Sequence, residues 1–165
     1  MSNRAKWAHN TGLEQSDWCM IYPDCSGLEK SPVNIITKKV KYDSWLSDFN
    51  FDDLKNLKNV RMKLKNNGHA IQVDFSGRKM KVTGGGLPGT YIVEQFHFHW
   101  GSKSTTGSEH RVNNKQSSME LHVVMYSDKY KSIGDAVKVT AGLAVLGILV
   151  NTGSHNSKYD PIVNG

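Results

Sequence analysis

Three histidines in two short stretches of the chain could together bind a metal ion. His97 and His99 alternate with aromatic residues, and His122 alternates with apolar residues in a later stretch. Alternation with a period of two is typical of a β-strand, whose successive side chains point to opposite faces. If the two strands are antiparallel neighbours in register, the three imidazoles meet on one face. Three histidines with an open fourth position are typical of a catalytic zinc site.

An amide and a carboxyl group accompany these histidines. Gln95 precedes His97 by two residues and Glu120 precedes His122 by two, so each shares the face of its histidine. Histidines that bind zinc usually need such an acceptor to fix the ring tautomer. An isolated His-x-His is also compatible with two exposed strand histidines, but that alternative leaves the third histidine and both acceptors without a role. We therefore predict that Zn²⁺ is bound by His97, His99 and His122.

The composition is that of an ordinary globular protein. Of the 165 residues, 38% are hydrophobic and 22% are charged, and the formal net charge is +6. The basic residues are dispersed, and those between Arg61 and Lys65 alternate with apolar residues as on the solvated face of a strand. Without a basic-aromatic array, we expect no nucleic-acid binding. The longest apolar run, Leu143 to Val150, is too short to span a bilayer and predicts a strand buried on both faces.

Alternation and turn residues predict a strand-rich chain with little helix. We expect strands within 60–75, 78–82 and 91–100, a polar loop over 101–115, and one short helix within 130–139. Asn67-Gly68 is a turn signal, which can bend the chain through a bulge rather than a hairpin. No clear strand or long helix is predicted after Thr152.

Six segments resemble the α-class carbonic anhydrases, in the order of that family and at nearly its spacing. They are Ser31-Pro32-Val33-Asn34-Ile35, Asn66-Asn67-Gly68-His69-Ala70, Gln95-Phe96-His97-Phe98-His99-Trp100-Gly101, Gly107-Ser108-Glu109-His110, Glu120-Leu121-His122 and Gly142-Leu143-Ala144-Val145-Leu146-Gly147. The resemblance implies a mostly β (α+β) fold: a large twisted, mainly antiparallel sheet with a few short helices. Because the family domain is longer, we expect residues 1–165 to be a single domain that is incomplete at its C-terminal side.

The resemblance also implies an activity, the reversible hydration of carbon dioxide to bicarbonate and a proton by a zinc-bound hydroxide. Three neutral ligands leave the full charge of the ion to act on a bound water, whose pKa in carbonic anhydrase itself is about 7. Val124, on the face of His122, and Val145, on a later strand, match residues that line the carbon dioxide pocket. From the pattern alone, both valines could equally well be ordinary core residues. Inhibition by sulfonamide-type compounds and by anions is expected from the same resemblance.

Four polar residues match further positions of the family's cavity. His69 matches the proton shuttle, and the unperturbed histidine pKa of about 6.5 suits that role. Asn67 and Gln72 match the polar lining, although the family often has Asn in place of Gln72. Glu109 matches a glutamate that accepts a hydrogen bond from the threonine that orients the zinc-bound hydroxide. That threonine belongs to the later part of the family domain.

Without the resemblance, two of these matched positions would be ordinary surface residues. His69 would be a solvated turn residue, and Glu109 and its neighbour His110 would be surface loop residues. Three interpretations of the whole chain stay open: an active enzyme, a zinc-binding but inactive binding or matrix module of carbonic-anhydrase type, or a fragment of an ordinary active enzyme. We favour the last of these.

Two cysteines bear on the compartment. The spacing of Cys19 and Cys25 is not that of a zinc site, so they either bridge each other or stay reduced. Extracellular members of the family have a cysteine near the position of Cys25, whose partner lies in the later part of the domain. We therefore predict a secreted or extracellular protein, with the cytoplasm as the alternative.

Overall fold

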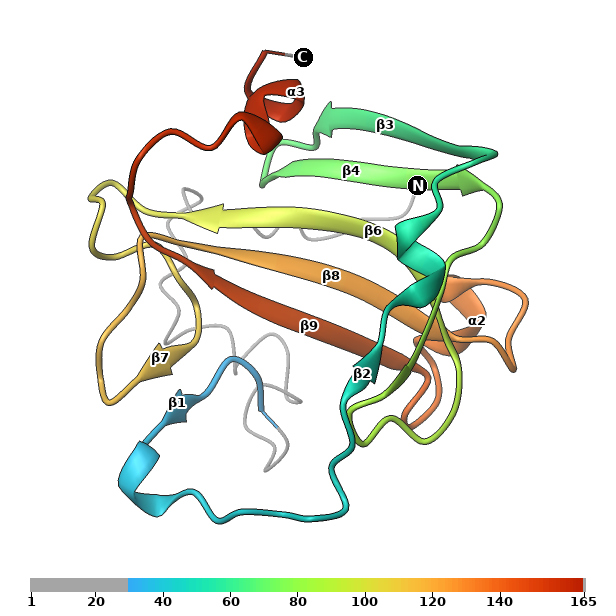
Figure 1. Cartoon of the computed structure of the whole chain (residues 1–165), viewed down its shortest axis with the longest axis horizontal. Helices are drawn as coiled ribbons and strands as arrows, with labels where there is room; N and C mark the ends of the chain where they lie inside the picture. The colour runs from blue at the N-terminus through green and yellow to red at the C-terminus, as the bar shows by residue number, and fades with distance from the viewer. Residues whose placement is uncertain (1–29, 165) are drawn as a thin grey trace, which may run out of the picture.

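The computed structural model describes residues 30–164, and Cys19 and Cys25 therefore lie outside the described residues (Figure 1). The strands are β1 (Asn34–Ile35), β2 (Phe49–Asn50), β3 (Val60–Asn66), β4 (Ile71–Gly77), β5 (Lys81–Gly84), β6 (Tyr91–Trp100), β7 (Arg111–Val112), β8 (Met119–Ser127) and β9 (Leu143–Val150). The helices are η3 (Thr37–Lys39), η4 (Asp52–Lys55), α2 (Ile133–Ala136), η5 (Ser157–Tyr159) and α3 (Asp160–Val163). The predicted strand-rich fold with a few short helices is confirmed.

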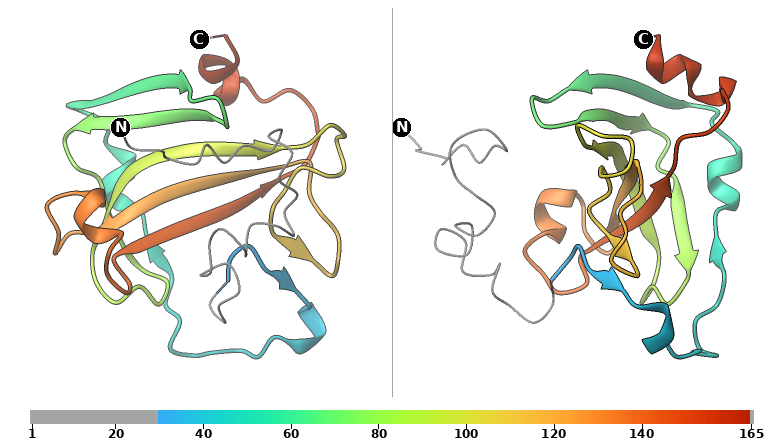
Figure 2. Two further views of the ribbon diagram at one scale, coloured as in Figure 1. Left: turned by 180° about the vertical axis from the view of Figure 1, so that it is seen from behind. Right: turned by 90° about the vertical axis from the view of Figure 1, so that its left-hand side faces the viewer.

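One antiparallel sheet holds this part of the chain together, and β6 lies at its centre (Figures 1 and 2). β8 pairs along the whole length of β6, while β4 and β5 pair with different halves of its other edge. β9 lies beyond β8, β3 beyond β4, and β2 beyond β5. The short strands β1 and β7 form a separate parallel pair. The long strands β6 and β8 therefore provide the platform for the candidate site.

A β-bulge at Glu94 decides which side chains of β6 share a face. Val93 pairs with Met125, whereas Gln95 pairs with Val124, so Glu94 is an extra residue in β6. Because Met125 and Val124 are consecutive and point to opposite faces, Val93 and Gln95 also do so. Val93 thereby joins the buried face, and Gln95 begins the face that carries the histidines.

Two apolar clusters lie on the two faces of the sheet. The larger cluster lies on the face opposite the histidines and contains the buried residues Met80, Val82, Tyr91, Val93 and Met125. The smaller cluster lies at one end of the histidine face, where α2 packs against β8 and contributes the fully buried Ala136. Ser132 is the N-cap of α2, and its hydroxyl oxygen accepts a hydrogen bond from the backbone N–H of Asp135 (3.3 Å). The predicted helix within 130–139 is thus present but shorter.

The turn at Asn67-Gly68 is a hairpin and not a bulge. β3 and β4 pair in register up to Asn66 opposite Ile71, which leaves a loop of residues 67–70. Gly68 has a φ of +84°, in the left-handed region that favours glycine. The Asn67 side-chain oxygen accepts hydrogen bonds from the backbone N–H groups of His69 (2.9 Å) and Ala70 (2.8 Å). These bonds close the loop locally, so no bulge is needed to turn the chain.

The strand predicted to begin at Arg78 begins at Lys81 instead. The Arg78 guanidinium donates to Asp53 Oδ1 (2.5 Å) and to the backbone carbonyl of Asn56. The backbone N–H of Lys81 donates to Asp53 Oδ2 (2.8 Å). Because Arg78 is tied to η4, it does not take part in the strand ladder, and pairing with β6 starts at Lys81.

The prediction that 143–150 is buried on both faces is wrong. Val145, Ile148 and Leu149 of β9 are 50%, 46% and 39% exposed. Among the described residues β9 pairs only with β8, so it is an edge strand there. Apolar composition alone does not distinguish such an edge from a central strand, because both carry Val, Ile and Leu.

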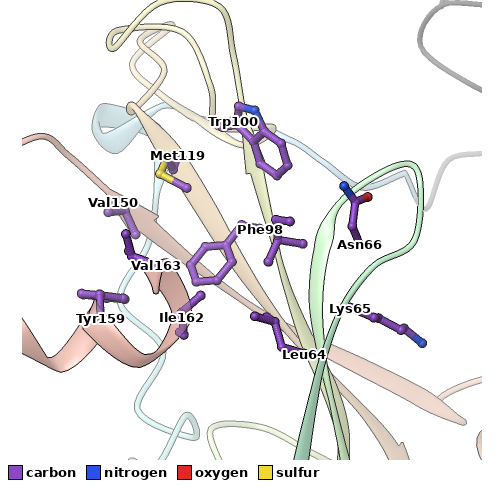
Figure 3. A pocket seen from close by; sticks show the side chains of 11 residues that line it. Leu64, Lys65, Asn66, Phe98, Trp100, Met119, Val150, Tyr159, Ile162 and Val163 are labelled. Atoms are coloured by element: carbon purple, nitrogen blue, oxygen red, sulfur yellow. The ribbon is translucent and has the colours of Figure 1, made fainter. Parts of the chain in front are cut away.

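An apolar groove of about 780 Å³ lies on the sheet face opposite the histidines (Figure 3). It is lined by sheet residues that include Leu64, Phe98, Trp100 and Met119, and by Tyr159, Ile162 and Val163 of the C-terminal η5 and α3. Phe98 and Trp100 alternate with the histidines of β6, which separates the groove from the candidate site by the thickness of the sheet.

Within residues 30–164, no helix is long and apolar enough to cross a bilayer.

Candidate metal centre

The pairing of β6 with β8 brings three histidine rings together. His97 lies directly opposite His122, and His99 lies opposite Glu120. The centroids of the three rings are 5.0 Å (His97 to His99), 5.3 Å (His97 to His122) and 4.6 Å (His99 to His122) apart. A nitrogen atom from each ring lies within 4.8 Å of those of the other two. The three rings therefore converge on one face of the sheet.

Two acceptors determine which nitrogen atoms of these rings point into the cluster. His97 Nδ1–H donates to Gln95 Oε1 (2.9 Å), and His97 Nε2 lies 3.1 Å from His99 Nε2. His122 Nε2–H donates to Glu120 Oε1 (2.7 Å), which leaves His122 Nδ1 as the ligand atom. Such acceptors fix the ring orientation of metal-binding histidines.

His97 is neutral at physiological pH. Burial, followed by the neighbouring His99 and His122, lowers the pKa of His97 from about 6.5 to about 4, against the opposing effect of Glu109. A histidine must be neutral to offer its lone pair to a metal ion. His97 is therefore held in the form that a metal ion requires.

Glu120 is fully buried, at 0% exposure, and accepts four hydrogen bonds. Its Oε2 accepts from the backbone N–H groups of Glu109 (2.9 Å) and His110 (2.8 Å). Its Oε1 accepts from His110 Nδ1 (2.5 Å) and His122 Nε2 (2.7 Å). Burial alone would raise the pKa of Glu120, but the hydrogen bonds from His110 and His122 outweigh it and the pKa is lowered. Glu120 is therefore an ionised acceptor behind His122.

Glu109 and His110 lie in a loop, as expected, but their side chains are partly buried and not at the open surface. Their side chains are only 33% and 25% exposed. Glu109 Oε2 lies 3.4 Å from His99 Nε2 and 3.8 Å from His122 Nδ1. His110 binds Glu120 through Nδ1, and its Nε2 is 3.2 Å from Ser31 Oγ. Sequence reasoning missed His110 because a loop has no periodicity that would place its side chain.

Of the remaining polar residues proposed from the sequence, Gln72 lies beside His97, and Asn67 and His69 lie in the adjacent hairpin loop. Gln72 of β4 is the cross-strand partner of His97. Asn67 Nδ2 donates to Gln72 Oε1 (2.8 Å), and Gln72 Nε2 donates to Asp74 Oδ1 (2.6 Å). His69 is exposed in the hairpin loop, three residues before Gln72. These residues form a polar strip from the hairpin toward the histidine cluster.

The two valines are neighbours on the histidine face. Val124 of β8 lies opposite Val145 of β9 in register. A cavity of about 370 Å³ is lined by Val145 together with Glu109, Glu120 and His122, among others. Val145 is half exposed, so this apolar wall is open on one side.

The donor set fits a metal ion at one position. Three imidazole nitrogens, two of them oriented by acceptors, are ligands that zinc and other late transition metals prefer. Among the described residues, His110, Glu120 and His122 also lie within 4.8 Å of one another. Because Glu120 Oε1 accepts the N–H groups of both of these rings, this second group is a hydrogen-bonded chain that supports His122.

Comparison with known proteins agrees with this arrangement. The family model for eukaryotic-type carbonic anhydrases matches residues 13–165. The chain belongs to this family. The resemblance seen in the six sequence segments is thereby confirmed, and the antiparallel sheet is consistent with the carbonic anhydrase fold.

Individual carbonic anhydrases align over nearly the whole chain. Human carbonic anhydrase 7 is 38% identical over 167 residues, which cover 99% of this chain and 62% of the relative. Bovine carbonic anhydrase 6 is 34% identical, covering 96% and 50%, and human carbonic anhydrase 12 is 35% identical, covering 97% and 45%. The chain thus spans less than two thirds of the length of these carbonic anhydrases.

Proposed function

We propose that His97, His99 and His122 hold Zn²⁺ and that the protein catalyses the reversible hydration of carbon dioxide. The observation that carries this proposal is the convergence of three imidazoles, two of them oriented by Gln95 and Glu120. Membership of the carbonic anhydrase family supports the reaction.

The ligand atoms follow from the hydrogen bonds. His97 would bind through Nε2 and His122 through Nδ1, because the opposite nitrogen of each ring donates to an acceptor. When bound, zinc acts as a Lewis acid that lowers the pKa of water and so supplies a nucleophile at neutral pH. The contribution of Gln95 and Glu120 is to keep both rings in the tautomer that binds metal.

Glu109 lies beside the histidine cluster, and Val124 and Val145 are neighbours on the same face of the sheet. Glu109 Oε2 is close to His99 and His122, so its carboxylate would accept a hydrogen bond from a donor held beside these two ligands. Val124 and Val145 offer an apolar wall beside His122, which favours a small uncharged substrate such as carbon dioxide. We assign the proton transfer to buffer to His69, whose loop is fixed by Asn67 and leads to Gln72 beside His97.

The test is stopped-flow hydration of carbon dioxide by the zinc-loaded chain. We expect zinc-dependent turnover that is lost in His97→Ala and blocked by an aromatic sulfonamide. His155→Ala is the matched control, because the His155 side chain is 74% exposed and its partner is Asp160, far along the chain from the cluster. Turnover that persists in His97→Ala would overturn the proposal.

A second candidate function is a zinc-binding module without this activity. The observation that favours it is the half-exposed Val145, which leaves the apolar wall beside the cluster open to solvent. One zinc bound per chain, lost in His97→Ala, together with no turnover would select this second candidate.

A further inference from the structure

We propose that Gly147 is a positioning residue of the metal centre, because its missing side chain leaves the space that the carboxylate of Glu120 occupies. The inference rests on the proposed three-histidine site. β9 runs beside β8 (Figure 1), and Gly147 of β9 pairs directly with His122 of β8. Cross-strand partners project to the same face of a sheet, so any side chain at 147 would lie on the histidine face.

The space beside Gly147 is already filled. A Cβ atom built on Gly147 would lie 2.7 Å from Glu120 Oε1 and 3.5 Å from His110 Nδ1. Non-bonded carbon atoms and their neighbours are most favourably separated by about 3.5–4.0 Å, so the Glu120 oxygen would have to move by several tenths of an ångström. The close approach thus explains why this position of the strand has no side chain.

The backbone gives no other reason for a glycine here. Gly147 is absent from the glycines with a positive φ, so its conformation is open to any residue. Glycine inside a strand is otherwise unfavourable, because it has no side chain to pack and loses more conformational entropy on folding. The requirement at this position therefore comes from Glu120.

Glu120 cannot move without weakening the site. The oxygen that meets the Cβ, Oε1, is the acceptor for both His110 and His122, and Oε2 is held by two backbone N–H groups. Glu120 is also fully buried, so no water replaces a lost contact. A side chain at 147 would therefore lengthen the Glu120 to His122 hydrogen bond, which selects the His122 tautomer with Nδ1 available.

The experiment compares Gly147→Ala with Gly153→Ala. Gly153 follows the same strand, and a Cβ there would meet nothing within 4 Å. In the metal-free chain, nitrogen-15 NMR of the imidazoles reports the tautomer of His122, and chelator competition reports the zinc dissociation constant. For Gly147→Ala we expect loss of the Nε2–H tautomer as the dominant form and about 10–100-fold weaker zinc binding, the usual effect of disturbing such an acceptor. Gly153→Ala should match the unsubstituted chain.

A double-mutant cycle distinguishes an effect on the position of Glu120 from a general loss of stability. In a Glu120→Ala background the space is empty, so adding Gly147→Ala should weaken zinc binding no further. The inference would be overturned if Gly147→Ala weakened zinc binding equally in the unsubstituted chain and in Glu120→Ala. It would also be overturned if Gly147→Ala changed neither the His122 tautomer nor the zinc affinity. If Gly147→Ala does not fold, recovery of folding in the double variant supports the inference and failure of both contradicts it. Because the tautomer is measured without metal, it decides the role of Gly147 even if the unsubstituted chain binds no zinc, a result that would overturn the proposed function instead.

Discussion

A fully buried carboxylate usually destabilises a folded protein, and Glu120 is tolerated because four N–H groups surround it. Three of these groups belong to Glu109 and His110 in the preceding loop, and one belongs to His122. The same contacts therefore stabilise the loop and orient a proposed metal ligand. At the scale of residues, folding and metal binding depend on one side chain.

Glu120→Gln tests this dual role. A neutral amide is a weaker acceptor for the two imidazoles, and its NH₂ group would face N–H donors. We expect zinc binding to weaken by about 10–100-fold, and the free energy of unfolding to fall by about 1–3 kcal/mol. Chelator competition and urea denaturation measure the two quantities. Glu94→Gln, at the bulge of β6, is the control, and an equal effect of both substitutions would contradict the assignment.

The lowered pKa of His97 predicts a pH dependence of the metal-free chain. Because the pKa is about 4 in the folded state and about 6.5 in an unfolded chain, the unfolded state binds more protons between these values. This contribution to stability is fully present above about pH 6.5 and is lost as the pH falls toward 4. We expect urea denaturation to show a smaller loss of stability from pH 7 to pH 5 in His97→Gln than in the unsubstituted chain. An identical loss of stability in both proteins would contradict the lowered pKa of His97 as a cause of the pH dependence.

At the scale of elements, the face that carries the histidines follows from simple alternation only within 95–100. The bulge at Glu94 shifts the parity of β6, so extending the alternation back to Tyr91 would place Val93 on the histidine face, whereas it belongs to the opposite, buried face. Nothing in the residue types around Glu94 marks the extra residue. The pattern predicted that the three histidines would share a face if the two strands paired in register, and it did not predict the bulge.

Within residues 30–164, β9 is an edge strand, and this edge predicts self-association. Long apolar edge strands expose unpaired backbone groups that pair with other chains, and charged side chains suppress this. Ile148, on the face opposite the histidines, is 46% exposed. We expect Ile148→Lys to slow aggregation of the protein, measured by light scattering at equal concentration. Val139→Lys is the control, because Val139 is 42% exposed but lies outside the strands, and equal protection by both variants would contradict a role of the edge.

At the scale of the whole molecule, the sheet separates two environments. One face carries the histidine cluster and its acceptors, and the other packs aromatic and aliphatic side chains, including Phe96 against Phe75 and Phe98 at centroid distances of 5.7 and 5.8 Å. The aromatic face fixes β6 and thereby the positions of the histidines between its aromatic residues. Alternation predicted a strand-rich chain, and the resemblance of six segments to the carbonic anhydrases predicted the family and its antiparallel sheet.

Two of the misjudged features depend on neighbours distant in sequence. Whether 143–150 is central or at an edge depends on which strands flank it. The role of His110 depends on the carboxylate of Glu120 reaching the loop from β8. Such contacts leave no periodic trace in the residues themselves, so they become visible only when the chain is folded.

The central claim is that three histidines hold one zinc ion. X-ray absorption spectroscopy of the zinc-loaded chain tests it most directly, because the distance and scattering of each ligand identify the donor atoms. We predict one zinc per chain with three nitrogen ligands at about 2.0–2.1 Å, one further light atom and no sulfur. A sulfur ligand at about 2.3 Å, which would place zinc on Cys19 or Cys25, or no stoichiometric binding at all, would contradict the account.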